Sequence, residues 1–184
     1  MKHQHRALRI IGGKWRGRKV RFPDQPDIRP TGDRIRETLF NWLMHDITGY
    51  QCLDLYAGSG ILGIEALSRG ASEVTFVETD PTTVGQLQRT LTDLDTGRGH
   101  IRQTPATEWL SGPCEPVDII FLDPPFDSDE LSRVCEIIDS RSLSRHYVYI
   151  ESGEPGIFEK LPASWTIHRK KRAGSVHYGL VETG

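Results

Sequence analysis

The sequence predicts an α/β fold with a doubly wound, mostly parallel sheet, on the basis of three features. Apolar strand-like runs alternate with amphipathic helical segments from residue 52 onward. Some of these runs, such as residues 117–122, are almost continuously apolar, which suits strands covered on both faces. Residues 165–182 instead show the two-residue alternation of an antiparallel hairpin. A chain of 184 residues has room for one such domain and an appendage.

The order of the elements follows from periodicity and turn residues. Strands of the main sheet are expected at residues 52–57, 73–77, 100–103, 117–122 and 147–151. Helices are expected at residues 61–70, 81–94 and 128–138. The terminal hairpin turns at Ala173-Gly174 and is expected to close the edge of the sheet.

The first 36 residues have a different character. Residues 8–22 alternate basic and apolar side chains around glycines, which predicts a small basic β-hairpin, and residues 23–30 form a turn-rich linker. Thr31 or Asp33 can then cap a helix with the apolar positions Ile35, Leu39, Phe40 and Leu43. We therefore divide the chain into a basic arm at residues 1–28, expected to bind RNA, and a main domain at residues 29–184.

Charge is strongly segregated along the chain, although the net charge is only −2. Residues 1–36 contain eleven Lys and Arg against three Asp, whereas the other 148 residues contain 12 basic and 22 acidic side chains. Residues 169–172 are a local basic exception. A basic arm on an acidic body predicts a polyanionic partner, and a merely solvated basic surface is the alternative.

Several classes of protein are disfavoured by composition. No apolar run approaches the ~20 residues of a membrane span, and the basic start lacks the apolar core of a secretory signal. A cytoplasmic protein is expected. The three cysteines, at positions 52, 114 and 135, fit neither a disulfide framework nor a C-x-x-C site, and the histidines lack metal-ligand spacing. No metal is predicted.

A glycine-rich turn follows the first strand of the main domain. Gly58-Ser59-Gly60 allows a tight turn and a close approach of a ligand to the backbone where the next helix begins. Glu78 ends the next strand, twenty residues after Gly58, where a carboxylate can accept hydrogen bonds from ribose hydroxyls. Asp54, four residues before Gly58, would oppose the phosphates of a dinucleotide.

A second motif follows the strand at residues 117–122. Asp123, Pro124, Pro125 and Phe126 place a carboxylate and a rigid diproline at the carboxyl edge of the sheet. The side chain of Asp123 and the carbonyl of Pro124 can accept both hydrogens of an exocyclic amine of a base, whose nitrogen is otherwise a poor nucleophile. Phe126 can stack on the base.

These two motifs resemble those of known enzymes. Residues 54–60 resemble the first motif of class I S-adenosylmethionine methyltransferases, in which the loop wraps the amino acid part of the cofactor. The resemblance implies S-adenosylmethionine as the cofactor and adds Tyr56, Ala57 and Ser59 to its site. The order of this loop before Asp123–Phe126 resembles amino-methyltransferases, which act on adenine N6, cytosine N4, guanine N2 or glutamine.

Nearly the whole chain is similar to the bacterial small-subunit ribosomal RNA guanine-N2 methyltransferases of the RsmD type. The residues that carry this resemblance are Arg9–Gly13, Arg16-Gly17, Arg29–Thr31, Arg36–Trp42, Leu53–Ala71, Asp123–Phe126, Ala173-Gly174 and Tyr178. The resemblance implies a cytoplasmic enzyme that converts one guanine of 16S ribosomal RNA to N2-methylguanine in an assembling or assembled small subunit. We expect a monomer.

Residue roles follow from this resemblance and from the charge pattern. The residues expected to contact RNA phosphates are Arg9, Lys14, Arg16, Arg18, Lys19, Arg169, Lys170, Lys171 and Arg172. Thr31 is assigned to the cofactor site, with RNA contact or helix capping left open, as for Arg34 and Arg36. Residues 104–107 lie where such enzymes contact the adenine ring.

Three alternative functions stay open. A DNA adenine-N6 or cytosine-N4 methyltransferase shares both motifs but usually adds a sizeable recognition insert, for which this chain has no room. A non-catalytic RNA-binding assembly factor would not need the intact Asp54, Glu78 and Asp123 motifs. A nicotinamide dehydrogenase is opposed by Asp54 and by the lack of a substrate domain.

Overall fold

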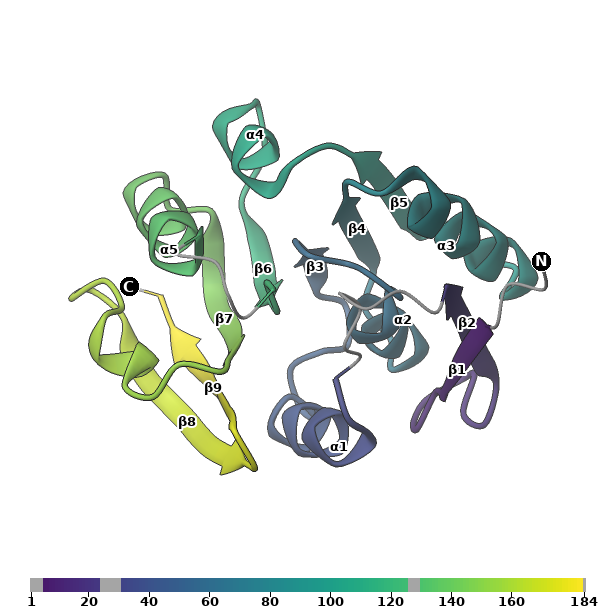
Figure 1. Ribbon diagram of the computed structural model, residues 1–184, viewed down its shortest axis with the longest axis horizontal. Coiled ribbons are helices and arrows are strands. Elements are labelled where there is room, and N and C mark those ends of the chain that lie inside the picture. The colour runs from purple at the N-terminus through teal and green to yellow at the C-terminus, as the bar shows by residue number, and fades with distance from the viewer. Residues whose placement is uncertain (1–4, 24–30, 126–129, 184) are drawn as a thin grey trace.

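A computed structural model describes residues 5–23, 31–125 and 130–183. Its main sheet has the order β5-β4-β3-β6-β7-β9-β8 (Figure 1). The strands are β3 (Gln51–Asp54), β4 (Glu73–Glu78), β5 (Gly99–Gln103), β6 (Val117–Leu122), β7 (Ser144–Ser152), β8 (Thr166–Ala173) and β9 (Val176–Glu182). The first five strands in this order pair in parallel, and β9 pairs antiparallel with both β7 and β8. The predicted doubly wound sheet with a terminal hairpin at its edge is confirmed.

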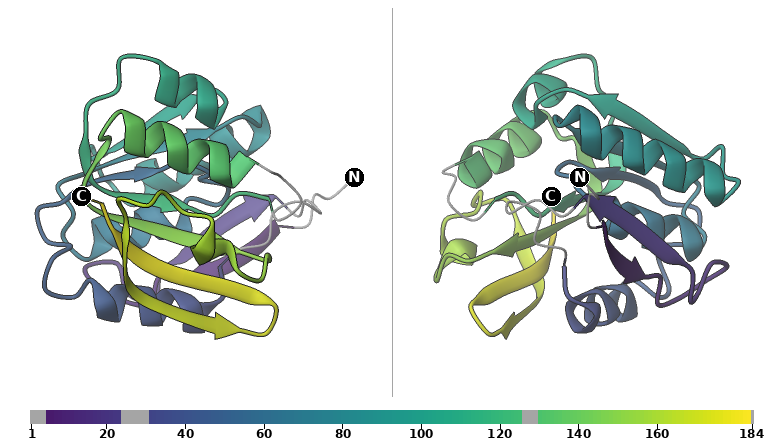
Figure 2. Two further views of the ribbon diagram at one scale, coloured as in Figure 1. Left: turned by 90° about the vertical axis from the view of Figure 1, so that its left-hand side faces the viewer. Right: turned by 45° about the vertical axis from the view of Figure 1, so that its right-hand side comes forward.

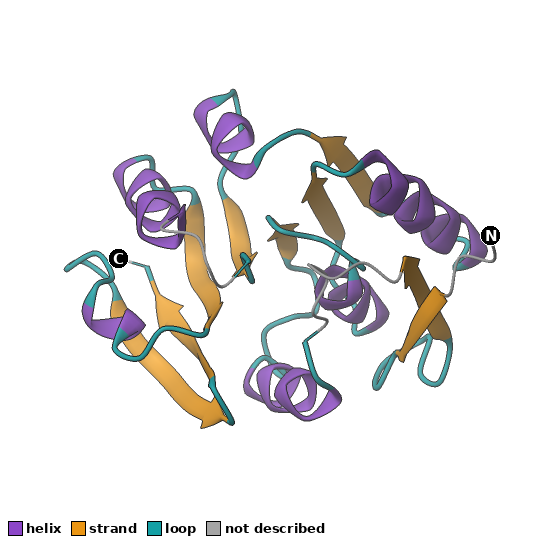
Figure 3. Cartoon of the chain, viewed as in Figure 1, coloured by secondary structure: helices purple, strands orange, loops and turns teal. Residues whose placement is uncertain are grey.

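Helices cover both faces of the sheet (Figures 2 and 3). One face packs against α1 (Asp33–Trp42), α2 (Ile61–Ser68) and α3 (Pro81–Asp93). The other packs against α4 (Ala106–Ser111), α5 (Glu130–Ser140) and the 3₁₀ turn η1 (Ile157–Glu159). Two apolar clusters therefore fill the core, one on each face. The short α4 was not predicted, because six residues are too few to show a helical period.

The predicted N-terminal hairpin is also present. Strands β1 (His5–Arg9) and β2 (Lys19–Pro23) pair antiparallel. The loop between them packs on α2, because the backbone N–H of Lys14 donates to the Ser68 carbonyl (2.7 Å) and that of Trp15 to the Ser68 hydroxyl (2.9 Å). Ile10, Trp15 and Val20 are buried in the same apolar cluster as α1 and α2.

Helix α1 begins differently from the prediction. Its N-cap is Gly32, and no side chain caps the helix. The expected capping role of Thr31 or Asp33 was wrong, since the Thr31 side chain hydrogen-bonds to Asp123 and Asp33 pairs with Arg36. The predicted apolar face of α1 is buried.

Helix α1 also joins the C-terminal hairpin. The ring of Trp42 stacks on that of Tyr178 in β9, with centroids 5.8 Å apart.

The described residues include no helix long and apolar enough to cross a membrane. Within the same residues, no cluster of three or more His, Cys, Asp or Glu could hold a metal ion. Cys52, Cys114 and Cys135 are free thiols.

Candidate active site

Four acidic side chains stand at the carboxyl ends of neighbouring parallel strands. Asp54 ends β3, Glu78 ends β4, Asp123 follows β6, and Glu151 lies near the end of β7. Parallel strands end at one edge of a sheet, and ligands of open α/β sheets bind outside that edge. The predicted carboxylates are therefore brought together, and they are joined by Glu151, which was not among the predicted site residues.

The loop between β3 and α2 combines tight packing with open space. Gly58 and Gly60 adopt positive φ angles of 48° and 73°. A Cβ at Gly60 would lie 2.4 Å from the Leu87 side chain, so a larger residue there would have to displace Leu87 and would also strain the positive φ. Among the described residues, a Cβ at Gly58 would have only the Tyr56 carbonyl oxygen within reach, at 4.0 Å. The backbone at Gly58 is therefore open to a ligand, as a wrapped cofactor requires.

Asp54 lies beneath this loop and supports the start of α2. Its side chain is buried and accepts a 3.0 Å hydrogen bond from the Gly63 backbone N–H. Burial raises the pKa of Asp54 to about 7, the Gly63 hydrogen bond opposes the rise, and the charge of Glu78 adds to it. Asp54 is therefore a carboxyl whose ionised form would gain from a cationic ligand.

Glu78 fastens the loop from the neighbouring strand. Its carboxylate accepts hydrogen bonds from the backbone N–H groups of Gly58 (2.8 Å), Thr79 (2.7 Å) and Asp80 (2.9 Å). An ionised carboxylate has about four acceptor positions. The Thr79 hydroxyl adds a longer bond of 3.4 Å to Oε1, whereas Oε2 accepts only the Gly58 bond among the described residues and so keeps capacity for a ligand hydroxyl.

The remaining predicted loop residues have structural contacts. The Ala57 N–H donates to the Val77 carbonyl (2.9 Å), and the buried Ser59 hydroxyl accepts a 3.4 Å bond from the Ile61 N–H as α2 begins. Tyr56 is half-buried against the second apolar cluster.

Beyond Glu78, the end of β5 borders a shallow pocket. The Thr104 N–H donates to the Glu78 carbonyl (3.2 Å), which places the segment expected to contact adenine beside Glu78. The pocket is lined by Arg102, Gln103, Thr104, Glu108, Trp109 and Gly112.

Asp123 lies just past the end of β6 and is partly buried. The Thr31 hydroxyl donates a 3.0 Å hydrogen bond to its carboxylate. Burial, followed by the charge of Glu151, raises the pKa of Asp123 well above its usual range, and the Thr31 hydrogen bond opposes this rise. Pro124 is buried and Pro125 is exposed. Phe126, the last residue of the predicted motif, lies outside the described residues.

Glu151 is buried beside Asp123, with 3% of its surface exposed. It accepts a 2.9 Å hydrogen bond from the buried Tyr149 hydroxyl. Burial raises the pKa of Glu151 to about 7, and hydrogen bonds from Tyr149 and Thr31 oppose the rise. A sequence signal for Glu151 did exist, because a carboxylate follows the apolar run of β7 much as Asp123 follows that of β6.

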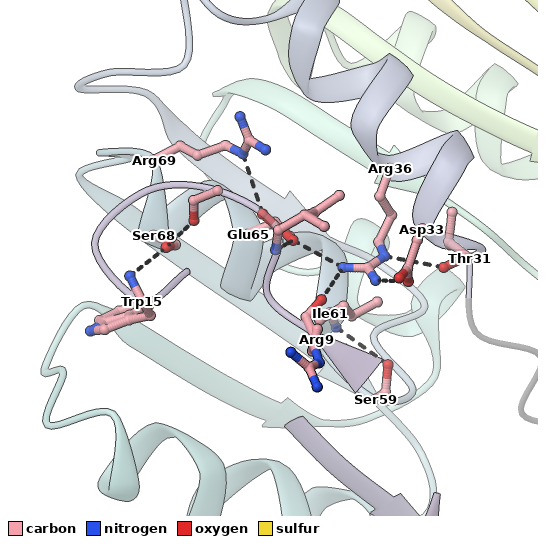
Figure 4. Close-up of polar contacts among 12 residues, drawn as sticks. Arg9, Trp15, Thr31, Asp33, Arg36, Ser59, Ile61, Glu65, Ser68 and Arg69 are labelled. Carbon is pink, nitrogen blue, oxygen red and sulfur yellow. Dashed lines mark hydrogen bonds and ion pairs between the residues drawn. The ribbon is translucent and has the colours of Figure 1, made fainter. Parts of the chain in front are cut away.

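A buried ion pair fixes the segment that carries Thr31 (Figure 4). The guanidinium of Arg36, fully buried in α1, contacts the buried carboxylate of Glu65 in α2 at 2.9 Å. Arg36 also donates to the Thr31 carbonyl (3.2 Å) and the Arg9 carbonyl (3.0 Å). Cofactor contact, RNA contact and helix capping were left open for Arg36, and the structure gives it a structural role that ties β1, Thr31 and α2 together. Arg34, for which the same roles were left open, is exposed.

The nine cations predicted to bind RNA are all exposed. Five belong to the N-terminal hairpin and its loop, and four to β8. Figure 1 shows α1 between these two hairpins. The Arg18 guanidinium donates to the Asp93 carbonyl (2.5 Å), and the Lys171 ammonium lies 6.0 Å from the centre of the Trp42 ring.

This sheet order, loop and row of carboxylates define a class I S-adenosylmethionine methyltransferase. The model of the family described as conserved hypothetical protein 95 matches residues 8–182. The chain belongs to this family, that of the RsmD-type methyltransferases.

Relatives match over nearly the whole chain. The "Ribosomal RNA small subunit methyltransferase D" of Escherichia coli K12 is 42% identical over 177 residues, which are 95% of this chain and 89% of that protein. The protein of the same name from Haemophilus influenzae is 40% identical over 183 residues, covering 95% and 93%.

Solved structures agree with the fold. The putative methyltransferase yhhF from Escherichia coli superposes with a TM-score of 0.87 at 40% identity, covering 97% of this chain and 98% of that one. The magnesium protoporphyrin IX methyltransferase of Synechocystis PCC 6803, solved with bound S-adenosylmethionine, has a TM-score of 0.66 at 15% identity and covers 82% and 79%. At that identity the likeness concerns the fold alone.

Proposed function

We propose that this protein transfers the methyl group of S-adenosylmethionine to the N2 amine of one guanine in small-subunit ribosomal RNA, within an assembling or assembled particle in the cytoplasm. The observation that carries the proposal is the position of Asp123 and Pro124 at the carboxyl end of β6, beside the β3–α2 loop. The names of the relatives from Escherichia coli and Haemophilus influenzae, which specify the small-subunit RNA, support the substrate.

Asp123 and Pro124 are assigned to the target amine. The lone pair of this nitrogen is delocalised into the base, so two acceptors that hold its hydrogens favour a pyramidal, more nucleophilic nitrogen. Asp123 supplies a side-chain oxygen and Pro124 a backbone carbonyl, while proline has no N–H to compete for them. Pro125 stiffens the turn, and Phe126 is proposed to stack on the base.

The β3–α2 loop is assigned to the cofactor, which when bound supplies an electrophilic methyl group on a sulfonium. The open backbone at Gly58 provides room, and Asp54 offers a negative charge near the expected ammonium group. Glu78 is assigned to the ribose hydroxyls. The other residues assigned to this site are Tyr56, Ala57, Ser59, Gly60 and Thr31. The bond from Thr31 to Asp123 favours a place for Thr31 where the cofactor and amine sites meet.

The exposed cations of the two hairpins are assigned to RNA phosphates. Phosphate contacts contribute affinity and orientation but carry little sequence information. This role suits surfaces that lie to the side of the site that binds the target base. Trp42 packs beneath the four cations of β8 at residues 169–172, since its ring lies under Lys171 and stacks on Tyr178.

The proposal is tested by methylation with labelled S-adenosylmethionine on undermethylated small-subunit particles, free ribosomal RNA and DNA in parallel, followed by nucleoside analysis. N2-methylguanine from one position of the particle or free ribosomal RNA is expected. Label in methylated adenine or cytosine of DNA would make this protein a DNA amino-methyltransferase. Particle binding without label in any nucleoside would make it a non-catalytic assembly factor.

A further inference from the structure

Asp123 and Glu151 form a pair of neighbouring carboxylates at the ends of the adjacent strands β6 and β7. Phe121 of β6 is in register with Tyr149 of the parallel strand β7. Asp123 and Glu151 each lie two residues further along, and side chains two apart on a strand share a face. The pair therefore lies on the face of the sheet that α1 covers, where Phe121 and Tyr149 are buried.

The hydroxyl of Thr31 lies at both members of this pair. It donates to the Asp123 carboxylate at 3.0 Å, and it also lies close enough to Glu151 to lower the pKa of that carboxyl, although its single hydrogen can serve only one of the two at a time. The Tyr149 hydroxyl donates to the other side of the pair, at Glu151 (2.9 Å). Two carboxylates and two hydroxyls thus form one connected polar cluster.

This cluster has no compensating cation within the part of the chain that the structure describes. Neither Asp123 nor Glu151 forms an ion pair there, although Glu151 is almost fully buried. The nearby groups that influence the cluster electrostatically are Asp54, Tyr149 and Tyr178, which supply no positive charge. A buried carboxyl beside a partly buried one, with no compensating cation, costs stability, and such an arrangement is typical of sites that handle protons.

We propose that Glu151 is a positioning residue of the methyl transfer: its buried charge makes Asp123 a stronger proton acceptor for the target amine, while the Thr31 hydroxyl holds the Asp123 carboxylate in place. This inference rests on the proposed function and extends it. When the N–CH₃ bond forms and the S–CH₃ bond breaks, the amine nitrogen gains a positive charge. One of its protons then moves to an Asp123 oxygen and from there to solvent, which restores a neutral methylamine.

A direct electrostatic consequence distinguishes this role from a structural one. A like charge next to a carboxylate raises the pKa of that carboxylate, as Glu151 does for Asp123. Replacing Glu151 with a neutral side chain should therefore lower the pKa of Asp123 and weaken it as a proton acceptor. A purely structural residue would reduce the folded fraction without moving the pH dependence of the reaction.

The test compares Glu151→Gln with the wild-type protein, using undermethylated small-subunit particles at a series of pH values. The acidic limb of the kcat profile should shift by about one pH unit to lower pH. At pH 8, kcat should fall about tenfold while KM for particles changes by less than about threefold. Glu151→Asp, which keeps the charge, should restore much of the rate. Glu154→Gln, an exposed carboxylate paired with Lys160, is the matched control and should behave as wild type.

Tyr149→Phe provides a second route if Glu151→Gln does not fold. It removes the hydroxyl that stabilises the Glu151 charge, so Glu151 stays protonated to higher pH. The acidic limb of the kcat profile should therefore also shift to lower pH, by a smaller amount than in Glu151→Gln. The inference would be overturned if the acidic limb of the kcat profile were unshifted in every variant that folds. A tenfold loss of cofactor affinity in Glu151→Gln, measured by calorimetry, would also overturn it, because Glu151 would then serve the cofactor.

The two proposals can fail separately. If the wild-type protein methylates guanine N2 and the variants keep its pH profile, only the role of Glu151 is lost. If the wild-type protein methylates another amine, the guanine assignment is lost while the same variants still test Glu151. If no nucleoside is methylated, both proposals are wrong.

Discussion

The Thr31 hydroxyl donates a 3.0 Å hydrogen bond to the carboxylate of Asp123, a residue 92 positions further along the chain. Thr31 lies two residues before the start of α1, and Asp123 follows β6. The buried Arg36 holds the Thr31 carbonyl and pairs with Glu65 in α2. Thr31 is therefore anchored directly to the proposed amine-binding carboxylate.

Thr31→Val keeps the shape of the side chain but removes this hydrogen bond. Hydrogen bonds to charged groups are worth ~1.5–3 kcal/mol, so kcat/KM for methyl transfer should fall by roughly 10- to 100-fold. The acidic limb of the pH profile should move upward, because the Thr31 bond lowers the pKa of Asp123. Thr31→Ser is the control and should retain most of the activity. Equal rates for the Val and Ser variants would remove the hydroxyl from the site.

Asp54→Asn should stabilise the cofactor-free protein at high pH. The folded-state pKa of Asp54 is raised from 3.8 to about 7, so between these values the folded protein binds more protons than the unfolded chain. As pH rises from about 4 to about 7, ionisation of Asp54 therefore lowers the free energy of unfolding of the wild-type protein. Relative to wild type, the variant should gain ~1–3 kcal/mol at pH 8 and much less near pH 4.

Urea unfolding at both pH values measures this difference. Asp93→Asn, at an exposed position in α3, is the matched control and should show little change. A variant that is equally destabilised at both pH values would contradict the assigned cost of burying Asp54. Cofactor affinity should fall in the same variant, because it lacks the negative charge assigned to the ammonium group.

The buried pair of Arg36 and Glu65 should be far more sensitive to single substitutions than to a double one. Arg36→Met leaves the buried Glu65 with only the partly exposed Arg69, and Glu65→Leu leaves the buried Arg36 with only the exposed Asp33. Each should cost up to ~3–5 kcal/mol of unfolding free energy. The double variant should be more stable than either single variant. Arg34→Met, exposed in the same helix, should change stability by less than ~0.5 kcal/mol. Additive losses in the double variant would mean that the two side chains do not act as a pair.

Neutralising cations of the N-terminal hairpin should alter the salt dependence of RNA binding. Arg16→Gln with Lys19→Gln should weaken binding and reduce the slope of log K against log salt by ~1–2, because each phosphate contact releases counterions. Arg18 is left intact because its guanidinium donates to the Asp93 carbonyl. Arg133→Gln, exposed on α5 against the opposite face of the sheet, serves as the control. An unchanged slope in the double variant would exclude this hairpin from the interface.

The sequence predicted those features that depend on local patterns. The bounds of β6 match the apolar run at residues 117–122, and the motifs around Asp54 and Asp123 identified two ends of strands at the site. Periodicity and turn chemistry are short-range signals, so strands, helices and terminal motifs follow from them. The division into an arm at residues 1–28 and a main domain stays a prediction.

The features that the sequence did not predict depend on contacts between distant residues. The Thr31–Asp123 bond spans 92 positions, and the Arg36–Glu65 pair spans 29. Glu151 looked like any polar residue near the end of a strand until β6 and β7 were paired in register. Helix α4 is too short for a periodic pattern. In each case the missing information was which segments lie side by side.

The central claim is that Asp123 binds the amine that receives the methyl group, and single-turnover methylation by Asp123→Ala tests it most directly. The rate on undermethylated small-subunit particles should fall by a factor on the order of 10² to 10³, because an acceptor for the reacting amine is lost. Affinity for S-adenosylmethionine, measured by calorimetry on the same preparation, should stay within about threefold of wild type. An unchanged methylation rate in this variant would contradict the account.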